Sequence, residues 1–283
     1  VVPAAGPAGP GPASDLTAYR PGPGGHGFLV GAGGAVVGYD AASGQALERY
    51  DARPPGPVFS CHASPDGLLV AAGSKERVVL FDRRTGKQVA VLQESFSDDV
   101  TSVRFTQDSR YLVAGGEDGL ITIFDVGKGT FDEDDALAAV LSTDTSIRKL
   151  GFFGKRGDML WCTTNIETLH CFNWRAAVAE DDAAGIESTT VLEDARGDAA
   201  RAAREAGVAE LAKVDYLIGC QYDAALERLT LAAGTAEGAV GIFPISKSKT
   251  KAKIKIKAPD HVCCGGHRAV VRACEFHNAR RGG

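Results

Sequence analysis

Residues 97–125, SDDVTSVRFTQDSRYLVAGGEDGLITIFD, contain three short apolar runs separated by two polar turns. The runs are rich in β-branched and aromatic residues, and Asp, Gly and Ser dominate the turns. This pattern predicts three consecutive antiparallel strands. Asp118-Gly119 lies in the second turn, where a two-residue hairpin loop needs a residue that adopts positive φ. The stretch therefore predicts a β-meander.

The same three-strand pattern recurs at residues 58–82, 147–173 and 216–243, and partly at 27–51. In each full copy, 20 or 21 residues separate the end of the first strand from the end of the third. Asp40, Asp82 and Asp125 close successive third strands and lie 42 and 43 residues apart, the period of a four-stranded propeller blade. One such unit cannot bury both of its faces, so several must pack around an axis. A β-sandwich is the alternative, which four matched units disfavour.

Several dipeptides resemble the motifs of the WD-repeat family. Tyr39-Asp40, Phe81-Asp82, Phe124-Asp125 and Asn173-Trp174 stand at the place of the family's Trp-Asp pair, and Gly266-His267 resembles the Gly-His pair that opens a blade. The resemblance covers roughly residues 25–277. It implies an all-β WD-repeat β-propeller with about five to six recognisable blades, some of them incomplete. It also implies structural roles in the blade turns for Asp66, Asp82, Asp118, Asp125 and His267.

Blades of this family are often locked by a hydrogen-bonded Asp–His–Ser/Thr–Trp set. Asp118 fits the place of the Asp, but no blade here contains all four members. We therefore expect packing to supply most of the stability, at about 1.5–3 kcal/mol for each large buried apolar side chain.

The two ends of the chain differ from the repeats. Residues 1–24 hold six of the twelve prolines and many glycines and alanines, which predicts a disordered lead-in to a propeller at 25–283. The unit at 27–51 lacks a clear first strand. Either that strand is missing upstream, or Ala269–Phe276 completes the sheet and removes an exposed edge. Because the chain starts at Val1 and stops inside a new unit, we expect a truncated gene product.

Residues 175–214 interrupt the repeat. Residues 198–214 are dominated by Ala, Arg and Glu, with Val208, Leu211 and Val214 at three-residue steps, which predicts a helix. We place this helical insertion at about 194–213. It either docks a partner or caps its own blade.

Residues 246–257, SKSKTKAKIKIK, form a basic strip with lysine at every second position. In one extended strand, all six ammonium groups would point one way and Ile254 and Ile256 the other. The strip is interpreted either as the outermost strand of the fifth blade, protecting an exposed edge, or as a contact for phosphates, an acidic protein or a nuclear import receptor. Its interaction candidates are Lys247, Lys249, Lys251, Lys253, Lys255 and Lys257.

Composition narrows the class of protein. The net charge of −5 gives no global attraction to nucleic acid or anionic lipid. No apolar run is long enough to span a bilayer and no flank resembles a signal peptide, so we expect an intracellular protein, cytoplasmic, nuclear or both. The seven cysteines are odd in number and lack disulfide-framework spacing, which indicates thiols in a reducing compartment.

The candidate chemical sites are weak. His261, Cys263, Cys264 and His267 cluster in sequence, but adjacent cysteines suit a tetrahedral zinc site poorly. Residues 132–135, DEDD, lack the alternating ligand spacing of a calcium loop and are expected to form a solvated loop. No nucleophile motif is present. We predict no catalytic residues, no metal, no cofactor, no small-molecule substrate and no membrane contact.

These observations lead to two hypotheses. The first is a non-enzymatic scaffold that mediates protein–protein interactions in a multiprotein complex through residues 95–99, 116–119 and the insertion. The alternative is a nucleic-acid or ribonucleoprotein-associated factor that uses the Lys247–Lys257 basic strip.

Overall fold

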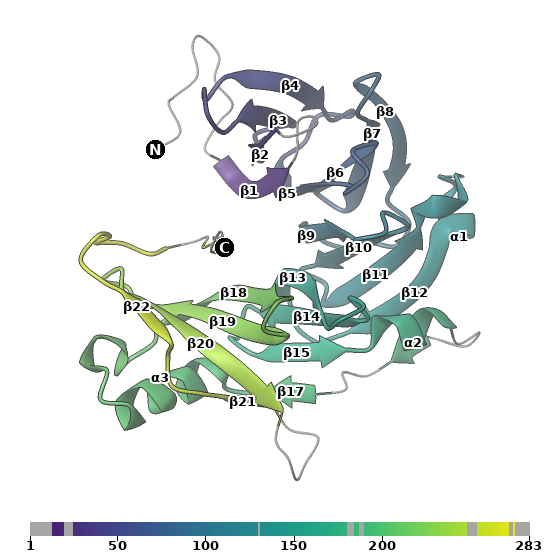
Figure 1. Cartoon of the computed structure of the whole chain (residues 1–283). Coiled ribbons are helices and arrows are strands. Elements are labelled where there is room, and N and C mark those ends of the chain that lie inside the picture. Colours follow the sequence, from purple (N-terminus) through teal and green to yellow (C-terminus); the bar gives the residue numbers. More distant parts are fainter. Residues whose placement is uncertain are drawn as a thin grey trace. The chain divides into compact units, whose positions relative to one another are not determined.

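The computed structural model describes residues 13–19, 25–129, 131–179, 184–186, 190–247, 254–271 and 274. The described residues form five sheets, most of them simple antiparallel meanders of consecutive strands (Figure 1). These are the blades of a β-propeller, so the predicted fold class is confirmed. The chain divides into two compact units, which comprise residues 1–150 with 175–187 and residues 151–174 with 188–283.

Unit 1 contains three blades. The first has the strand order β1-β2-β3-β4 and the second β5-β6-β7-β8, while the third has the order β9-β10-β11-β12 with β16 added beside β12. The strands are β1 (Ala13–Tyr19), β2 (Gly27–Ala32), β3 (Ala35–Asp40), β4 (Ala46–Asp51), β5 (Val58–Ala63), β6 (Leu69–Ser74), β7 (Arg77–Asp82), β8 (Lys87–Leu92), β9 (Val100–Phe105), β10 (Tyr111–Gly116), β11 (Leu120–Asp125), β12 (Leu137–Ser142) and β16 (Ala184–Ile186). The short helices are η1 (Val126–Lys128), α1 (Glu133–Ala136) and α2 (Trp174–Ala179), of which α2 belongs to unit 1 from Arg175 onward.

The first blade corrects our expectation that residues 1–24 are disordered throughout. Ala13–Tyr19 forms β1 and supplies the strand that the repeat at 27–51 lacked, so neither of the two sources we considered for that strand is needed. The proline- and glycine-rich composition of the whole segment concealed a stretch of seven residues that contains neither. Thr17 and Tyr19 alternate with exposed neighbours and are buried, as in a half-buried strand.

Apolar side chains fill the spaces between neighbouring blades of unit 1. One cluster joins Tyr19, Leu29 and Tyr50 of the first blade to Val70 and Phe81 of the second. A second cluster joins Leu80 and Leu92 to Val103, Leu112 and Phe124 of the third blade. Alternate residues of one inner strand therefore pack toward opposite neighbours, with Phe81 in the first cluster and Leu80 in the second.

The outermost strands share a deviation from regular pairing. In β4, β8 and β12 one extra residue interrupts the pairing with the neighbouring strand, at Leu47, Val89 and Ala138 respectively. Each interruption falls next to the aromatic residue of the third strand. A bulge at a sheet edge bends the strand and disfavours edge-to-edge pairing with another molecule.

Unit 2 contains two blades, with orders β13-β14-β15-β17 and β18-β19-β20-β21, and the unit boundary falls within β13. Its strands are β13 (Ile147–Phe153), β14 (Met159–Thr164), β15 (Leu169–Phe172), β17 (Thr190–Leu192), β18 (Tyr216–Asp223), β19 (Arg228–Gly234), β20 (Val240–Lys247), β21 (Ile254–Ile256) and β22 (His261–Cys263), which also pairs with β20. Of the described residues 269–271 and 274, none belongs to a strand.

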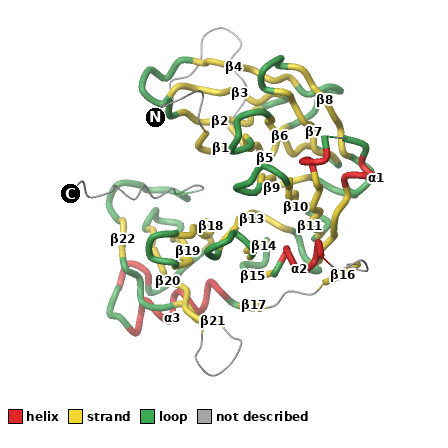
Figure 2. Tube along the Cα trace, turned by 45° about the vertical axis from the view of Figure 1, so that its right-hand side comes forward, coloured by secondary structure: helices red, strands yellow, loops and turns green. Residues whose placement is uncertain are grey.

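The helical insertion forms α3 (Ala195–Glu205) and the short η2 (Ala209–Leu211). Its helix begins three residues before the predicted start, where the side chain of Asp194 accepts a hydrogen bond from Gly197 N. It ends early because Gly207 adopts φ +74°, and Val208 N then bonds back to Ala203 O. The buried alanines of α3 join the core of unit 2, and Figures 1 and 2 show α3 alongside β21. Of the two roles we considered for the insertion, these contacts support capping.

The basic strip is not one strand, which corrects the sequence interpretation. Lys247 ends β20 and pairs with Ile254 on antiparallel β21, so the chain reverses direction between them. Lys249, Lys251 and Lys253 lie outside the described residues, while Lys255 and Lys257 are exposed. Ile254 is buried and Ile256 packs against the same core, as expected for the outermost strand. A period of two specifies a strand but not where that strand turns.

Candidate interaction surface

Three loops meet at one end of unit 1, and we call them together the acidic loop surface. They are residues 93–99 between β8 and β9, the turn 116–119 between β10 and β11, and residues 143–146 between β12 and β13. Glu117 N donates to Asp99 O at 2.9 Å, and Ser146 Oγ donates to Glu117 O at 2.8 Å. The turn 116–119 is thus hydrogen-bonded to the loop 93–99 on one side and to the loop 143–146 on the other. Both stretches proposed from the sequence as contact loops, 95–99 and 116–119, belong to this surface.

Asp118 holds the turn 116–119 and the loop 93–99 together by side-chain hydrogen bonds. Its Oδ2 accepts hydrogen bonds from Ser97 N and Ser97 Oγ, both at 3.2 Å, and its Oδ1 accepts one from Leu120 N at 3.0 Å. Ser97 therefore acts as the partner of Asp118 in a blade that has no histidine nearby in sequence. The Asp118–Ser97 pair thus stands where many blades of the family have the hydrogen-bonded Asp–His–Ser/Thr–Trp set.

Glycine is required at the tip of the turn. Gly119 has φ +81°, and a Cβ there would lie 2.9 Å from Thr145 N, in the neighbouring loop. Thr143 N and Thr143 Oγ1 both donate to Gly119 O. Because the two backbones approach so closely, the turn and the 143–146 loop form one rigid structure.

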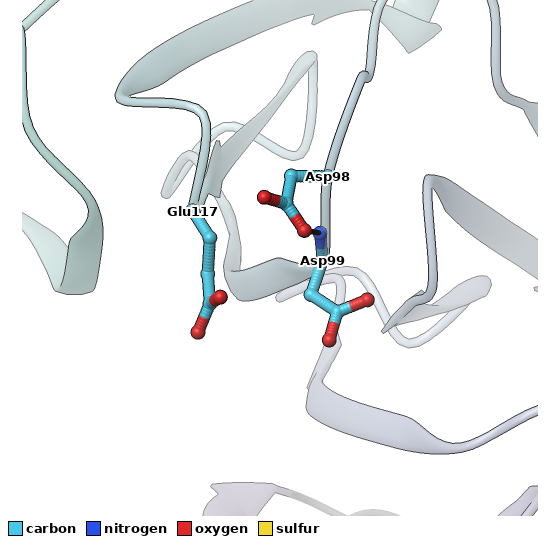
Figure 3. A group of neighbouring side chains, drawn as sticks. All are labelled: Asp98, Asp99 and Glu117. Carbon is cyan, nitrogen blue, oxygen red and sulfur yellow. Dashed lines mark hydrogen bonds between the residues drawn. The ribbon is translucent and has the colours of Figure 1, made fainter.

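Three carboxylates gather on the acidic loop surface. One carboxylate oxygen from each of Asp98, Asp99 and Glu117 lies within 4.8 Å of the other two, and Figure 3 shows the three side chains on two neighbouring segments. Asp98 and Glu117 are exposed, and Asp99 is half-buried. Burial raises the pKa of Asp99, and the adjacent Asp98 raises that pKa further. The like charges are thus close enough to repel one another and would be stabilised by a positively charged partner.

One anchoring residue was missed in the sequence. Glu133 belongs to the acidic run 132–135, which we expected to be a solvated loop. Its Oε2 accepts hydrogen bonds from Gln93 N and Glu94 N at 2.7 and 3.0 Å, and its Oε1 accepts one from Ser95 N at 2.9 Å. A carboxylate that accepts three backbone hydrogen bonds holds the 93–99 loop in place. Nothing in the spacing of the run distinguished Glu133 from its neighbours.

The other turn aspartates bond locally: Asp66 lies in the turn between β5 and β6, whereas Asp82 and Asp125 end β7 and β11. Asp66 accepts from Ser64 Oγ at 2.5 Å and from Leu68 N, and Asp82 accepts from Thr85 N at 2.8 Å. Asp125 is buried, accepts from Gly127 N and pairs with Arg110 at 2.9 Å. These contacts close turns. His267 is exposed in unit 2, where its backbone carbonyl lies against Gly238.

The half-buried His62 and the buried thiol of Cys61, both in unit 1, have environments unsuited to proton transfer. Burial lowers the pKa of His62 to about 3, and the nearby Arg104 contributes to the shift. His62 Nδ1 accepts a hydrogen bond from Phe105 N at 3.1 Å, so this side chain joins the second blade to the third. Burial raises the pKa of the Cys61 thiol to about 12. A neutral histidine and a protonated thiol of this kind are structural groups.

Comparison with known proteins agrees with this geometry. Residues 86–125 match the family model described as "WD domain, G-beta repeat". The chain is 35% identical over 242 residues to WD repeat-containing protein GTS1 of Arabidopsis thaliana, an alignment that covers 85% of this chain and 57% of that protein. This is a WD-repeat protein.

Two further relatives are consistent with that assignment. The chain is 29% identical over 235 residues to the WD repeat-containing protein 89 homolog of Dictyostelium discoideum, covering 83% of this chain and 58% of the relative. It is 35% identical over 92 residues to human WD repeat-containing protein 18, covering 32% of this chain and 18% of the relative. The chain thus spans a little over half the length of the first two relatives. The predicted WD-repeat family is confirmed.

WD-repeat propellers generally act as protein-interaction scaffolds and are typically not enzymes. In the described part of this WD-repeat protein, no helix is long and apolar enough to cross a membrane. The nuclear or cytoplasmic location stays a prediction, as does the nucleic-acid hypothesis, for which three of the six strip lysines lie outside the described residues.

Proposed function

We propose that this protein is a non-enzymatic scaffold in a multiprotein complex and that the acidic loop surface is one of its contact sites. The observation that carries the proposal is the set of cross-loop hydrogen bonds that hold Asp98, Asp99 and Glu117 together on a rigid support. Since these loops are already ordered, a partner need not bear the entropy cost of ordering them.

The chemistry of the surface favours a partner segment rich in lysine or arginine. Charges on a binding surface mainly govern partner choice and the rate of association. The partner would place an ammonium or guanidinium group between the exposed Asp98 and Glu117 and thereby relieve the repulsion around Asp99. Exposed groups of this kind are screened by salt, so binding should weaken as ionic strength rises.

The test is affinity purification of the tagged protein from cells, with and without nuclease, followed by mass spectrometry. We expect a set of proteins that survives nuclease treatment. Reversal of both exposed charges, Asp98→Lys with Glu117→Lys, should release some of them. Asp134→Lys is the matched control, because Asp134 is an exposed acid in the same unit but outside the acidic loop surface. Partners that vanish with nuclease, or that the control releases equally, would contradict the proposal.

A further inference from the structure

A pocket of about 370 Å³ opens at the end of the first blade. It lies between the β2–β3 turn, the end of β4 and the loop that follows β4. The residues that line it are Gly34, Arg49, Asp51, Ala52, Arg53 and Pro55. We call it the Arg53 pocket.

The walls of the Arg53 pocket are held by hydrogen bonds from two strands of the second blade and by one bond within the lining. Arg53 N donates to Gln88 Oε1 and Gln88 Nε2 donates to Arg53 O, both at 2.9 Å. Arg77 Nη2 donates to Pro54 O at 2.6 Å, and Ala52 N donates to Gly34 O at 3.0 Å. Side chains of the second blade thus brace the loop, so the pocket is formed before any ligand arrives.

The charged side chains that line the Arg53 pocket leave one positive charge without a carboxylate partner among the described residues. Arg49 is neutralised by Asp51, to whose Oδ1 it donates from Nε and Nη2 at 2.9 and 2.7 Å. Arg53 is exposed, and within the described ranges of the chain no carboxylate pairs with its guanidinium. Besides Arg53, the lining offers the apolar ring of the exposed Pro55 and the backbone of Gly34, while Ala52 is buried at its base. The pocket therefore combines an apolar floor with one unneutralised positive charge.

We propose that the Arg53 pocket binds an acidic segment of a partner protein. A carboxylate of that segment pairs with the Arg53 guanidinium, which presents a planar fork of donors that matches it. An adjoining apolar side chain packs against the exposed Pro55. The proposal rests on the scaffold function and extends it, because the acidic loop surface, of opposite charge, would take a different segment.

The experiment is a peptide array probed with the full 283-residue chain. Each twelve-residue peptide carries a central Leu or Phe flanked by Asp and Glu, by Lys, or by Ser. Those that bind are then titrated by fluorescence anisotropy against the wild type, Arg53→Glu, Arg53→Lys and Arg84→Glu. Arg84 is the matched control, since it is another highly exposed arginine of unit 1 and lies outside the lining. A labelled oligothymidylate of equal charge tests for phosphate binding.

We expect the acid-flanked peptides alone to bind, and Arg53→Glu to weaken them about tenfold or more, the loss of one charge-assisted pair. Arg53→Lys should retain part of the affinity, and Arg84→Glu should change it less than about twofold, as for an exposed charge. Circular dichroism of each variant checks that it is folded before its binding is compared.

Three results would overturn the proposal: no preference for acid-flanked peptides, an equal loss in Arg84→Glu, or Arg53-dependent binding of the oligothymidylate in place of the peptides. If cellular partners persist while the array shows no preference, the Arg53 pocket fails and the scaffold function stands. If no partners are recovered from cells, the scaffold function fails whatever the array shows.

Discussion

Removal of the Arg83 side chain should loosen the junction between the first two blades. Arg83 follows β7 of the second blade, and its Nε lies 3.1 Å from both carboxylate oxygens of Glu48 on β4 of the first blade. Arg83 Nη2 adds a contact of 3.0 Å, and Arg83 Cζ lies 5.1 Å above the ring of Tyr19 on β1. Tyr50 Oη donates to the same carboxylate at 2.6 Å. One guanidinium therefore joins β1, β4 and β7.

The magnitude follows from burial. The Arg83 and Glu48 side chains are only 12% and 20% exposed, so water screens the pair weakly. An exposed pair contributes about 0–1 kcal/mol, whereas breaking a fully buried pair costs about 3–5 kcal/mol because one charge is left unpaired. For Arg83→Ala we expect a loss of about 2–3 kcal/mol in the free energy of unfolding, between those two cases. With a urea m-value of about 2–3 kcal/mol/M, the midpoint should fall by about 1 M.

The assay is urea unfolding followed by far-ultraviolet circular dichroism. Both tryptophans, Trp161 and Trp174, belong to unit 2, so their fluorescence does not monitor this junction directly. Arg84→Ala is the control, because the Arg84 side chain is 84% exposed and lies 3.7 Å from its partner Asp82. A loss in Arg83→Ala within 0.5 kcal/mol of that control would refute the assignment of the pair as a blade junction, since a change of about that size is ordinary for a surface substitution.

Three further predictions concern pH, backbone strain and thiol reactivity. Burial alone would raise the pKa of Glu48, but hydrogen bonds from Arg83 and Tyr50 outweigh burial and lower that pKa below the usual 4.5. The ionised Glu48 carboxylate should therefore stabilise the fold fully above pH 4.5, and this stabilisation should be lost as pH falls through the lowered pKa. Acid unfolding of Glu48→Gln should not show this component. Gly119→Ala should lower the free energy of unfolding by about 2–3 kcal/mol, and the control Gly86→Ala by about 1 kcal/mol. Both glycines have positive φ, but only Gly119 faces a neighbouring backbone, so equal losses in the two variants would contradict the steric argument. With a thiol reagent at pH 8, the exposed Cys263, Cys264 and Cys274 should react in the native protein. The buried Cys61 and Cys162 should react only on unfolding, because burial raises the pKa of both thiols, and fast reaction of these two in the native protein would contradict the prediction.

Local sequence signals failed where a decision depended on partners distant in the chain. The alternation Thr17, Tyr19 is too short to be recognised beside twelve residues rich in proline and glycine. Its backbone pairs with β2, and side-chain bonds attach it to β5, because Thr17 Oγ1 donates to Cys61 O at 3.0 Å and Asp15 Oδ2 accepts from Cys61 N at 2.9 Å. The prediction that the basic strip forms one strand was wrong for the opposite reason. Its regular two-residue period was a strong signal, but it did not reveal that the chain reverses direction within the strip.

The candidate surface shows the same division. Gly119 could be recognised as a turn glycine, and residues 95–99 and 116–119 as exposed loops, from the sequence alone. The role of Glu133 as anchor of the 93–99 loop could not, because its three bonds span 38 to 40 residues. The Arg53 pocket likewise depends on Gln88 and Arg77, which are 35 and 24 residues away in the chain.

The sequence by itself determined that the chain repeats a four-stranded unit, since the strand period, the turn glycines and the 42- to 43-residue spacing are all local or regular features. Only the tertiary structure decided which strand completes the first blade, where the basic segment turns and which charged side chains become neighbours. The physical reason is that the period of a side chain along one strand sets its face, whereas its partners are set by the packing of a separate blade about one repeat away in sequence.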